Sequence, residues 1–388
     1  MTTSCSDRIF PRSPCGMYLF AVLFLLFVMQ FVASAAKKKQ PKNIPLILKS
    51  ADSNENTYVN DEFISILRGN VTFLYDDITI RSDEATWWRT EGKVHFNNHV
   101  KIVQKAQTLT CDRMIFTKAS NQIDASGHFF YRDTVELTEL SGDKATYLIE
   151  QKIFTLTGSP KLVRYDTAAA ETLVIVGKKV NYVDSIKTAT VFDKVVITKG
   201  KLVSHCERAE YETDSSIARL RINPSATFDL NELIGDSIDL YFGKESLRSA
   251  SVFGDAHGVY IDTSGKSNDT AFTHVWGDSL FMSLSDTGSL DSLRVHGKAI
   301  SKYFNSDDRE AVNEARGKIM RIAFGADGNV DNVKIWGNAR SIYHIEETDS
   351  RGINEADGDS ITVFFRKGKA AILNLAGSAR GKFFPSDM

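Results

Sequence analysis

Hydrophobic and polar residues alternate along most of this 388-residue chain, and the pattern is clearest between residues 67 and 88. That stretch contains two alternating runs, formed by Val71 with Phe73 and by Ile78 with Ile80, and a third run starts at Ala85 and Trp87. A period of two built from β-branched and aromatic residues is typical of strands, whereas Gly and paired Asp residues are typical of turns. The stretch therefore predicts an all-β unit with turns at Asp76-Asp77 and Ser82-Asp83.

The same unit recurs down the chain. The position of Asp83 is repeated every 30 residues or so in the first part and about every 40 residues later, at Asp112, Asp143, Lys178, Glu207, Asp236, Asp278, Lys318 and Asp359. A second series of turn residues lies between them and begins with Gly69, Asn98, Gly127 and Gly158. Near-periodic similarity of this length indicates an array in which stacked repeats build the core together.

The alternation also predicts which residues face the interior. We expect an apolar inner face that includes Val71, Phe73, Ile78, Ile80, Val100, Ile102, Leu109, Val195 and Ile197. Two architectures use these residues equally well. One is a closed β-solenoid with an apolar core, and the other is an open V-shaped sheet whose interior is a lipid groove.

Residues 1–36 have the pattern of a targeting segment. Arg8 and Arg12 precede an apolar run over residues 17–32, and Ala33-Ser34-Ala35 has the small-x-small form of a signal-peptidase site. Cleavage is the favoured interpretation, and retention as an inner-membrane anchor is the alternative because the basic run 37–39 follows directly. Residues 37–45 form a Lys/Pro-rich linker.

Repeat length divides the remaining chain into two predicted regions, 46–223 and 224–388. In the second region the extra residues fall at one point of each repeat, at 262–270, 305–314 and 346–355. Insertions at equivalent points become loops on one side of an array. Thr287-Gly288, Asp327-Gly328 and Lys367-Gly368 supply hairpin turns in the same repeats.

The search for catalytic or metal-binding signatures finds none, so we expect no enzyme activity, no metal site and no cofactor. The recurring acidic residue could suggest a carboxylate pair for glycoside chemistry, but one acid per repeat is more typical of hydrogen bonding at turns. The net charge of −2 gives no reason to propose a nucleic-acid partner. Cys111 and Cys206 lie several repeats apart, which predicts two free thiols instead of a disulfide.

Beyond these patterns, the chain resembles a known family. The order Gly-Asn-Val-x-Phe, then Ile-x-Ile-x-Ser-Asp-x-Ala, over residues 67–85 resembles the OstA-like family, which includes LptA and the N-terminal domain of LptD. Similar patterns occur at residues 98–114, 130–147 and 195–211, and the longer repeats after Pro224 match the family pattern weakly.

The resemblance implies a repetitive antiparallel β-jellyroll in the periplasm that binds lipopolysaccharide and shields its acyl chains between the inner and outer membranes. It also implies contacts with other lipopolysaccharide-transport proteins at both membranes. The rival hypothesis is an exported structural or adhesive β-solenoid with no lipid ligand.

The ends of the array favour head-to-tail self-association. Stacked strands leave unpaired backbone groups at the first and last rungs. The array is expected to begin near Phe63 without a helical cap, and one strand follows Gly377 without a further partner. An open edge of this kind can accept a strand from another chain.

Overall fold

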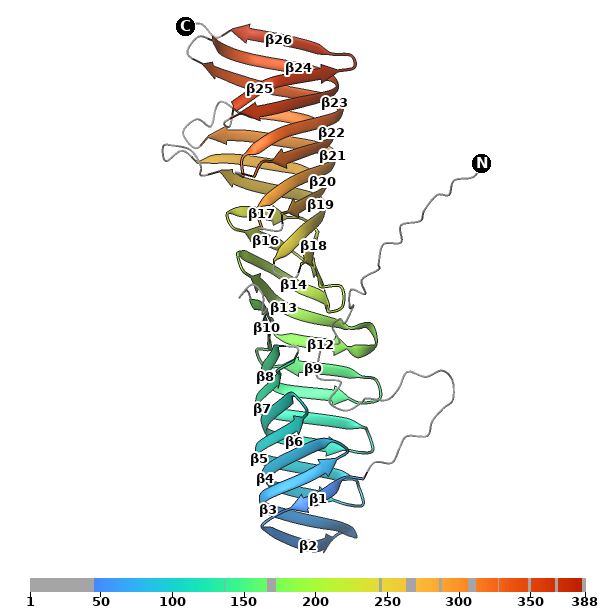
Figure 1. Ribbon diagram of the computed structural model, residues 1–388. Coiled ribbons are helices and arrows are strands. Elements are labelled where there is room, and N and C mark those ends of the chain that lie inside the picture. Colours follow the sequence, from blue (N-terminus) through green and yellow to red (C-terminus); the bar gives the residue numbers. More distant parts are fainter. Residues whose placement is uncertain are drawn as a thin grey trace, which may run out of the picture.

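The computed structural model describes residues 45–385, except 136, 166–171, 244–245, 263–269, 286–287, 306–311, 327, 348–349 and 367–368. These residues form one antiparallel sheet of 26 strands, coiled into an elongated stack that runs from β2 at one end to β26 at the other (Figure 1). The predicted all-β antiparallel fold is confirmed. Within the described part of the chain, no helix is long and apolar enough to cross a membrane.

The first strands are long and regular: β1 (Ile47–Ser50), β2 (Ser53–Val59), β3 (Glu62–Tyr75), β4 (Ile78–Trp88), β5 (Lys93–Gln104), β6 (Gln107–Thr117), β7 (Gln122–Asp133) and β8 (Thr138–Leu148). The middle of the chain has shorter strands: β9 (Ile153–Thr157), β10 (Lys161–Tyr165), β11 (Thr172–Val176), β12 (Lys179–Val183), β13 (Thr188–Lys199), β14 (Leu202–Glu212), β15 (Ile217–Arg221), β16 (Ser225–Phe228), β17 (Asn231–Ile234) and β18 (Ser237–Phe242). The last strands are the longest: β19 (Leu247–Asp262), β20 (Ala271–Leu284), β21 (Leu290–Asn305), β22 (Asn313–Phe324), β23 (Val330–Glu347), β24 (Ser350–Arg366), β25 (Lys369–Ala376) and β26 (Arg380–Pro385).

Each long strand bends near its middle. The bend is formed by two consecutive residues or by a β-bulge, where the pairing register with the neighbouring strand shifts. In β3 the bend residues are Gly69 and Asn70, with φ of 71° and 47°, and the pairing register shifts there between Arg68 and Val71. Such left-handed conformations favour Gly and Asn. Of the predicted turn residues, Gly69, Asn98 and Gly127 are therefore bends inside strands, whereas Gly158 lies between β9 and β10. Ser82-Asp83 was also predicted as a turn, and this was wrong, because β4 continues through it to Trp88.

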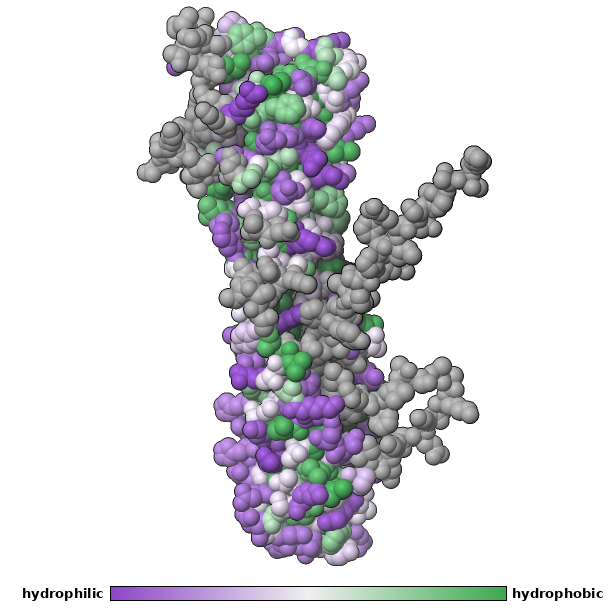
Figure 2. Space-filling model, viewed as in Figure 1, coloured by the Kyte–Doolittle hydropathy of each residue, from purple (hydrophilic) through white to green (hydrophobic). Residues whose placement is uncertain are grey.

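The bends divide the sheet into two walls whose inner faces oppose each other. We call wall A the part that contains residues 71–75 of β3 and the segments paired with them. Wall B contains residues 62–68 of β3 and the segments paired with them. The short strands β10, β11, β16 and β17 lie in wall A alone, and β9, β12, β15 and β18 lie in wall B alone. Figure 2 shows that hydrophilic residues cover much of the outside, with apolar patches between them.

The recurring acidic residue has a structural role at these bends. The side chain of Asp236 lies across Gly254 of the next bend, so close that a Cβ on Gly254 would lie 2.1 Å from Asp236 Oδ2. Asp112 and Asp278 cover Gly127 and Gly297 in the same way. The recurring carboxylates accept hydrogen bonds from the neighbouring bend. Asn70 Nδ2 donates to Oδ2 of Asp52, which lies one repeat before Asp83, at 2.9 Å, and Lys194 N donates to Glu207 Oε2 at 3.3 Å. The recurring acidic residues therefore hold successive bends together.

Two further expectations need correction. The array begins before Phe63, because β1 pairs with wall A of β3 and β2 pairs with wall B of β3. The third insertion is not a simple loop, since β23 and β24 extend into it and pair as far as Glu347 and Ser350. The other two insertions lie largely outside the described residues. Thr287 lies outside the described residues, but a turn at Gly288 is shown by the bonds from Gly288 N to Ser285 O and from Ser285 N to Ser289 O.

The bend architecture makes a testable prediction about glycine. Gly254 and Gly288 both have left-handed φ (72° and 78°), but only Gly254 lies under a carboxylate, whereas nothing lies within 4 Å of a Cβ on Gly288. Gly288→Ala should cost about 1 kcal/mol of stability from the backbone alone. Gly254→Ala should cost a further 1–3 kcal/mol or so from overpacking. Urea unfolding followed by circular dichroism measures both.

The control is the double variant Gly254→Ala with Asp236→Ala, which removes the covering side chain. It should recover most of the additional loss. Equal destabilisation by Gly254→Ala and Gly288→Ala would contradict the proposed role of the covering carboxylate.

Candidate functional site

All nine residues predicted to face the interior lie on the inner face of wall A. Eight of them are at most 5% exposed, and Ile80 is partly buried against the same core. The cross-strand register explains how they come together, because Phe73 pairs with Ile80, Ile80 with Ile102, and Ile102 with Leu109. The row continues along the stack through Tyr131, Leu140, Leu162 and Ile175 to Ile197.

The opposing face of wall B carries a second apolar row that was not predicted as part of the site. From β3 to β25 it runs without a polar residue, through Leu67, Ala85, Phe96, Met114, Ala125, Ala145, Leu156, Val180, Val191, Ala209, Leu220, Ile238, Val252, Leu280, Val295, Met320, Ile335, Ile361 and Leu375. The apolar pair at fixed spacing after each acidic position, such as Ala85 with Trp87, was the signal in the sequence that could have identified this row.

The two walls touch across the interior. The ring of Phe73 in wall A packs edge-on against Trp87 and Phe96 of wall B, with centroid distances of 5.5 and 5.4 Å. Phe129 and Phe154 make a similar contact at 6.1 Å. In this structure the described interior is therefore filled by its own side chains.

Polar residues of wall A replace the apolar ones farther from the bends. Gln104, Gln107, Asp133 and Thr138 are all less than 10% exposed and follow one another across β5 to β8. Gln107 Nε2 donates to Asp133 Oδ2 at 2.8 Å. On the next strand, Arg164 Nη1 donates across the interior to the Tyr211 hydroxyl of wall B at 3.3 Å. Wall A is thus apolar near the bends and polar farther from them, whereas wall B stays apolar or aromatic at the corresponding positions, such as Trp87, Val94 and Phe116.

The chemistry of wall A changes along the stack. After Ile197 the inner row consists mainly of small residues: Ser204, Ala226, Leu233, Gly258, Val275, Ser301, Ala315, Ser341 and Ala356. Wall B keeps its large side chains over the same strands. Beyond β14 this row of wall A therefore buries less apolar surface than the facing row of wall B, although Tyr260 of wall A still packs against Phe324 of wall B, with ring centroids 5.1 Å apart.

Neither buried cysteine is placed for chemistry. Burial is the main cause that raises the pKa of Cys111 to about 12 and that of Cys206 to about 11. A thiol with so high a pKa is a poor nucleophile at neutral pH. Both cysteines are free, as predicted. Across the described ranges, no group of three or more His, Cys, Asp or Glu side chains could hold a metal ion.

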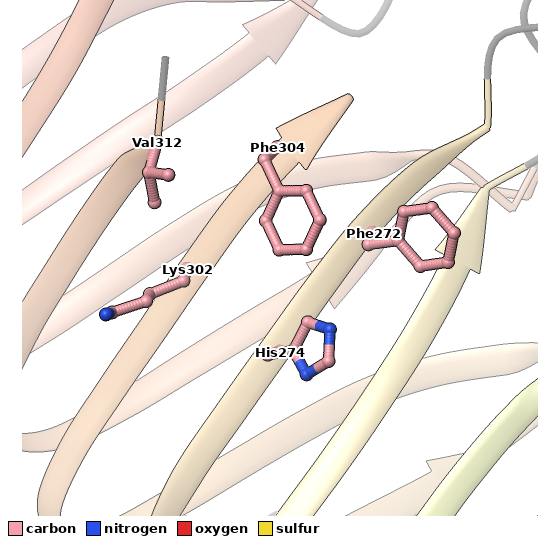
Figure 3. Close-up of a pocket in the computed structure, with 5 residues that line it drawn as sticks. All are labelled: Phe272, His274, Lys302, Phe304 and Val312. Atoms are coloured by element: carbon pink, nitrogen blue, oxygen red, sulfur yellow. The ribbon is translucent and has the colours of Figure 1, made fainter. Parts of the chain in front are cut away.

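Outside the interior, a shallow hollow lies on the outer face of wall A, lined by Phe272, His274, Lys302, Phe304 and Val312 (Figure 3). His274 stacks on Phe304, with ring centroids 5.6 Å apart, and lies 3.1 Å from His257 through their ring nitrogens. Burial lowers the pKa of both histidines, and the proximity of His274 lowers that of His257 further. These outward-facing aromatic residues were not predicted.

The stacked histidines predict a pH dependence of stability. Their folded-state pKa values lie below the usual value near 6.5, so below that pH the unfolded chain binds protons that the folded chain does not. Stability should therefore fall as pH drops from 6.5. The double variant His257→Gln/His274→Gln should weaken this dependence in thermal melts at pH 5.5 and 8.

His99→Gln is the control because its sign is opposite. The hydrogen bond from His99 to Asp83, 2.6 Å long, raises the pKa of His99. Replacing His99 should reduce stability at pH 5.5 relative to pH 8. A melting profile with the same pH dependence in the double variant and the unaltered chain would contradict the assignment.

Two of the comparisons with known proteins give a match. The family model described as "LptA/(LptD N-terminal domain) LPS transport protein" matches residues 50–245, about half of the chain. The crystal structure of LptH, described as the LptA homologous periplasmic component of the conserved lipopolysaccharide transport device from Pseudomonas aeruginosa, is 13% identical. That comparison covers 37% of this chain and 82% of LptH, with a TM-score of 0.22. No curated protein matches.

The family match begins within the first rung and includes every one of the predicted interior residues. The family is described as one of transport proteins. The chain belongs to the LptA/LptD N-terminal domain family of lipopolysaccharide transport proteins.

Proposed function

We propose that this protein carries or bridges lipopolysaccharide across the periplasm, with the lipid acyl chains held between walls A and B. The observation that supports this most is the pair of facing apolar rows, which run over many strands, with polar residues beside them on wall A at Gln104, Gln107, Asp133 and Thr138. Such an interior matches an amphiphile, whose acyl chains need apolar burial and whose headgroup needs polar contacts. Residues 1–36, the predicted signal peptide, would export the chain.

The energetic basis is burial. Each acyl CH₂ removed from water is worth about 0.8 kcal/mol, so a lipid with several chains does not cross an aqueous compartment unaided. The proposed acyl-chain site is the predicted set Val71, Phe73, Ile78, Ile80, Val100, Ile102, Leu109, Val195 and Ile197, together with the facing row of wall B.

Entry of a lipid requires the walls to separate about the bends. Contacts such as Phe73 with Phe96 would be replaced by contacts with acyl chains, so the apolar side chains stay out of water. Replacing wall-to-wall contacts by wall-to-lipid contacts costs little hydrophobic energy, because the inner faces of both walls stay buried before and after the lipid enters. Separation would also break rim contacts such as that between Arg164 and Tyr211.

The second candidate is an exported structural β-solenoid without a lipid ligand. The filled interior is the observation that favours it, since wall-to-wall packing alone satisfies the apolar rows. The two candidates differ in whether the walls ever part to admit a lipid.

A photo-crosslinking experiment separates them. A crosslinker at Ile80 or Ile102, on the inner face of wall A, should capture lipopolysaccharide in cells. One at Arg81 or Lys101 should not, because adjacent residues of a strand point to opposite faces and both of these cations are exposed. Equal labelling at inward and outward positions, or none at either, would remove the acyl-chain site.

Among the described strands, β26 pairs with β24 on one side only, and β2 pairs only with β3. These edges support a proposal of head-to-tail association with itself or with other transport components. At the C-terminal end, Ile372, Phe383 and Phe384 are 46–49% exposed, so the last rung leaves apolar surface uncovered. Unpaired strand edges next to apolar side chains favour strand addition.

Light scattering over a concentration series tests the self-association part. We expect the average mass to rise with concentration, and we expect deletion of residues 378–388 to abolish the rise by removing β26 and its exposed phenylalanines. A chain that stays monomeric at high concentration, with or without the deletion, would count against association through this edge.

A further inference from the structure

A row of three cations crosses the outer face of wall B in the last third of the chain. Arg294 of β21 pairs directly with Arg321 of β22, and Arg321 pairs with Lys334 of β23. Strands in a sheet are about 4.8 Å apart, so the three side chains start within about 10 Å of one another. They point outward, because the inner face of these strands is formed by Val295, Met320 and Ile335.

The three cations lack the carboxylate partners that other cations on the same strands have. On the outer face of wall A, Lys302 lies 3.8 Å from Glu314, Arg316 is paired with Glu314, and Arg340 lies 3.5 Å from Glu355. Among the described residues, none forms an ion pair with Arg294, Arg321 or Lys334. Like charges directly opposite each other destabilise a sheet, so this row has a cost in the isolated chain.

The surrounding outward positions contain no Asp or Glu. On β20 to β24 they are Ser279, Phe281 and Ser283, then Ser292 and His296, then Ile319 and Ala323, then Asn332 and Trp336, and finally Ser360, Thr362 and Phe364. The carboxylates nearest the hairpin ends, Asp291 and Asp331, accept hydrogen bonds from Ser283 and Asn332. The chain as a whole carries a net charge of −2, so this positive patch is a local feature.

Exposed aromatic side chains lie beside the cations. Phe253, Phe281 and Trp336 are 38%, 37% and 40% exposed. Phe253 packs edge-on against Phe281, which packs edge-on against His296, so these three rings form a connected cluster toward the bend. We call these residues and the three cations the basic-aromatic face.

We propose that the basic-aromatic face docks on the surface of an anionic lipid bilayer. Lys and Arg are drawn to anionic headgroups, while Trp and Phe are favoured at the boundary between headgroups and acyl chains. The face lies on adjacent strands of one wall, so all of these side chains can meet a flat surface together. Anionic headgroups would also relieve the repulsion within the cation row. A membrane fits better than an acidic protein segment, which would not require the row of exposed rings.

Vesicle cosedimentation with the full chain, purified after export, tests the proposal. The probes are phosphatidylcholine vesicles with or without about a third phosphatidylglycerol. At low ionic strength the chain should bind the anionic vesicles preferentially. The triple variant Arg294→Gln/Arg321→Gln/Lys334→Gln should bind them at least tenfold or so more weakly, since each cation near an anionic surface contributes appreciably to binding.

The matched control is Lys302→Gln/Arg316→Gln/Arg340→Gln, which removes the same charge from the same three strands on the other wall. It should bind within about twofold of the unaltered chain. Equal weakening in both triple variants, or no preference of the unaltered chain for anionic vesicles, would overturn the proposal. The second outcome would leave an acidic protein partner as the alternative.

A second measurement needs no change to the cations. Brominated phosphatidylglycerol should quench tryptophan fluorescence of the unaltered chain, and Trp336→Phe should lose most of that quenching. Quenching that persists in Trp336→Phe would place the contact elsewhere. Both tests are independent of lipid binding in the interior, so their failure would leave the proposed function unaffected.

Discussion

Contact between the apolar inner faces of walls A and B is the interaction on which the rest of this structure depends. No single repeat can bury its apolar residues, because a pair of bent strands has nothing to cover its inner face. Stacking extends both faces together, so Phe73 of one wall meets Trp87 and Phe96 of the other. The row of wall B remains apolar from Leu67 to Leu375, which makes the stack one continuous body.

Much of this arrangement could be predicted from the sequence, and the remainder has a physical explanation. Period-two alternation correctly predicted the strands. It also correctly predicted that the nine residues of the proposed site, from Val71 to Ile197, face the interior. Gly69 and Ser82-Asp83 were assigned to turns because Gly, Asn and Asp are favoured equally in a turn and in a bend within a strand. Wall B was missed for the same reason, since a strand believed to end at Ser82 cannot contribute Ala85 to an opposing face.

The two halves of the stack use the same frame with different side chains. Up to Ile197 the apolar row of wall A consists of large residues, and beyond it the same row consists mostly of Gly, Ala and Ser. The basic-aromatic face lies on the outer face of wall B in this second part. The family match covers the first of these parts and ends at residue 245. We therefore interpret the N-terminal part as the proposed lipid-binding segment and the C-terminal part as the segment that meets its surroundings.

The most direct test of the central claim is mass spectrometry of lipid bound to the exported protein, purified without detergent from cells that make lipopolysaccharide. If the interior carries acyl chains, the protein should retain a multiply acylated lipid that dissociates only when the chain unfolds. Protein that is folded by circular dichroism and free of acylated lipid would contradict the account, and would indicate that walls A and B serve only to pack against each other.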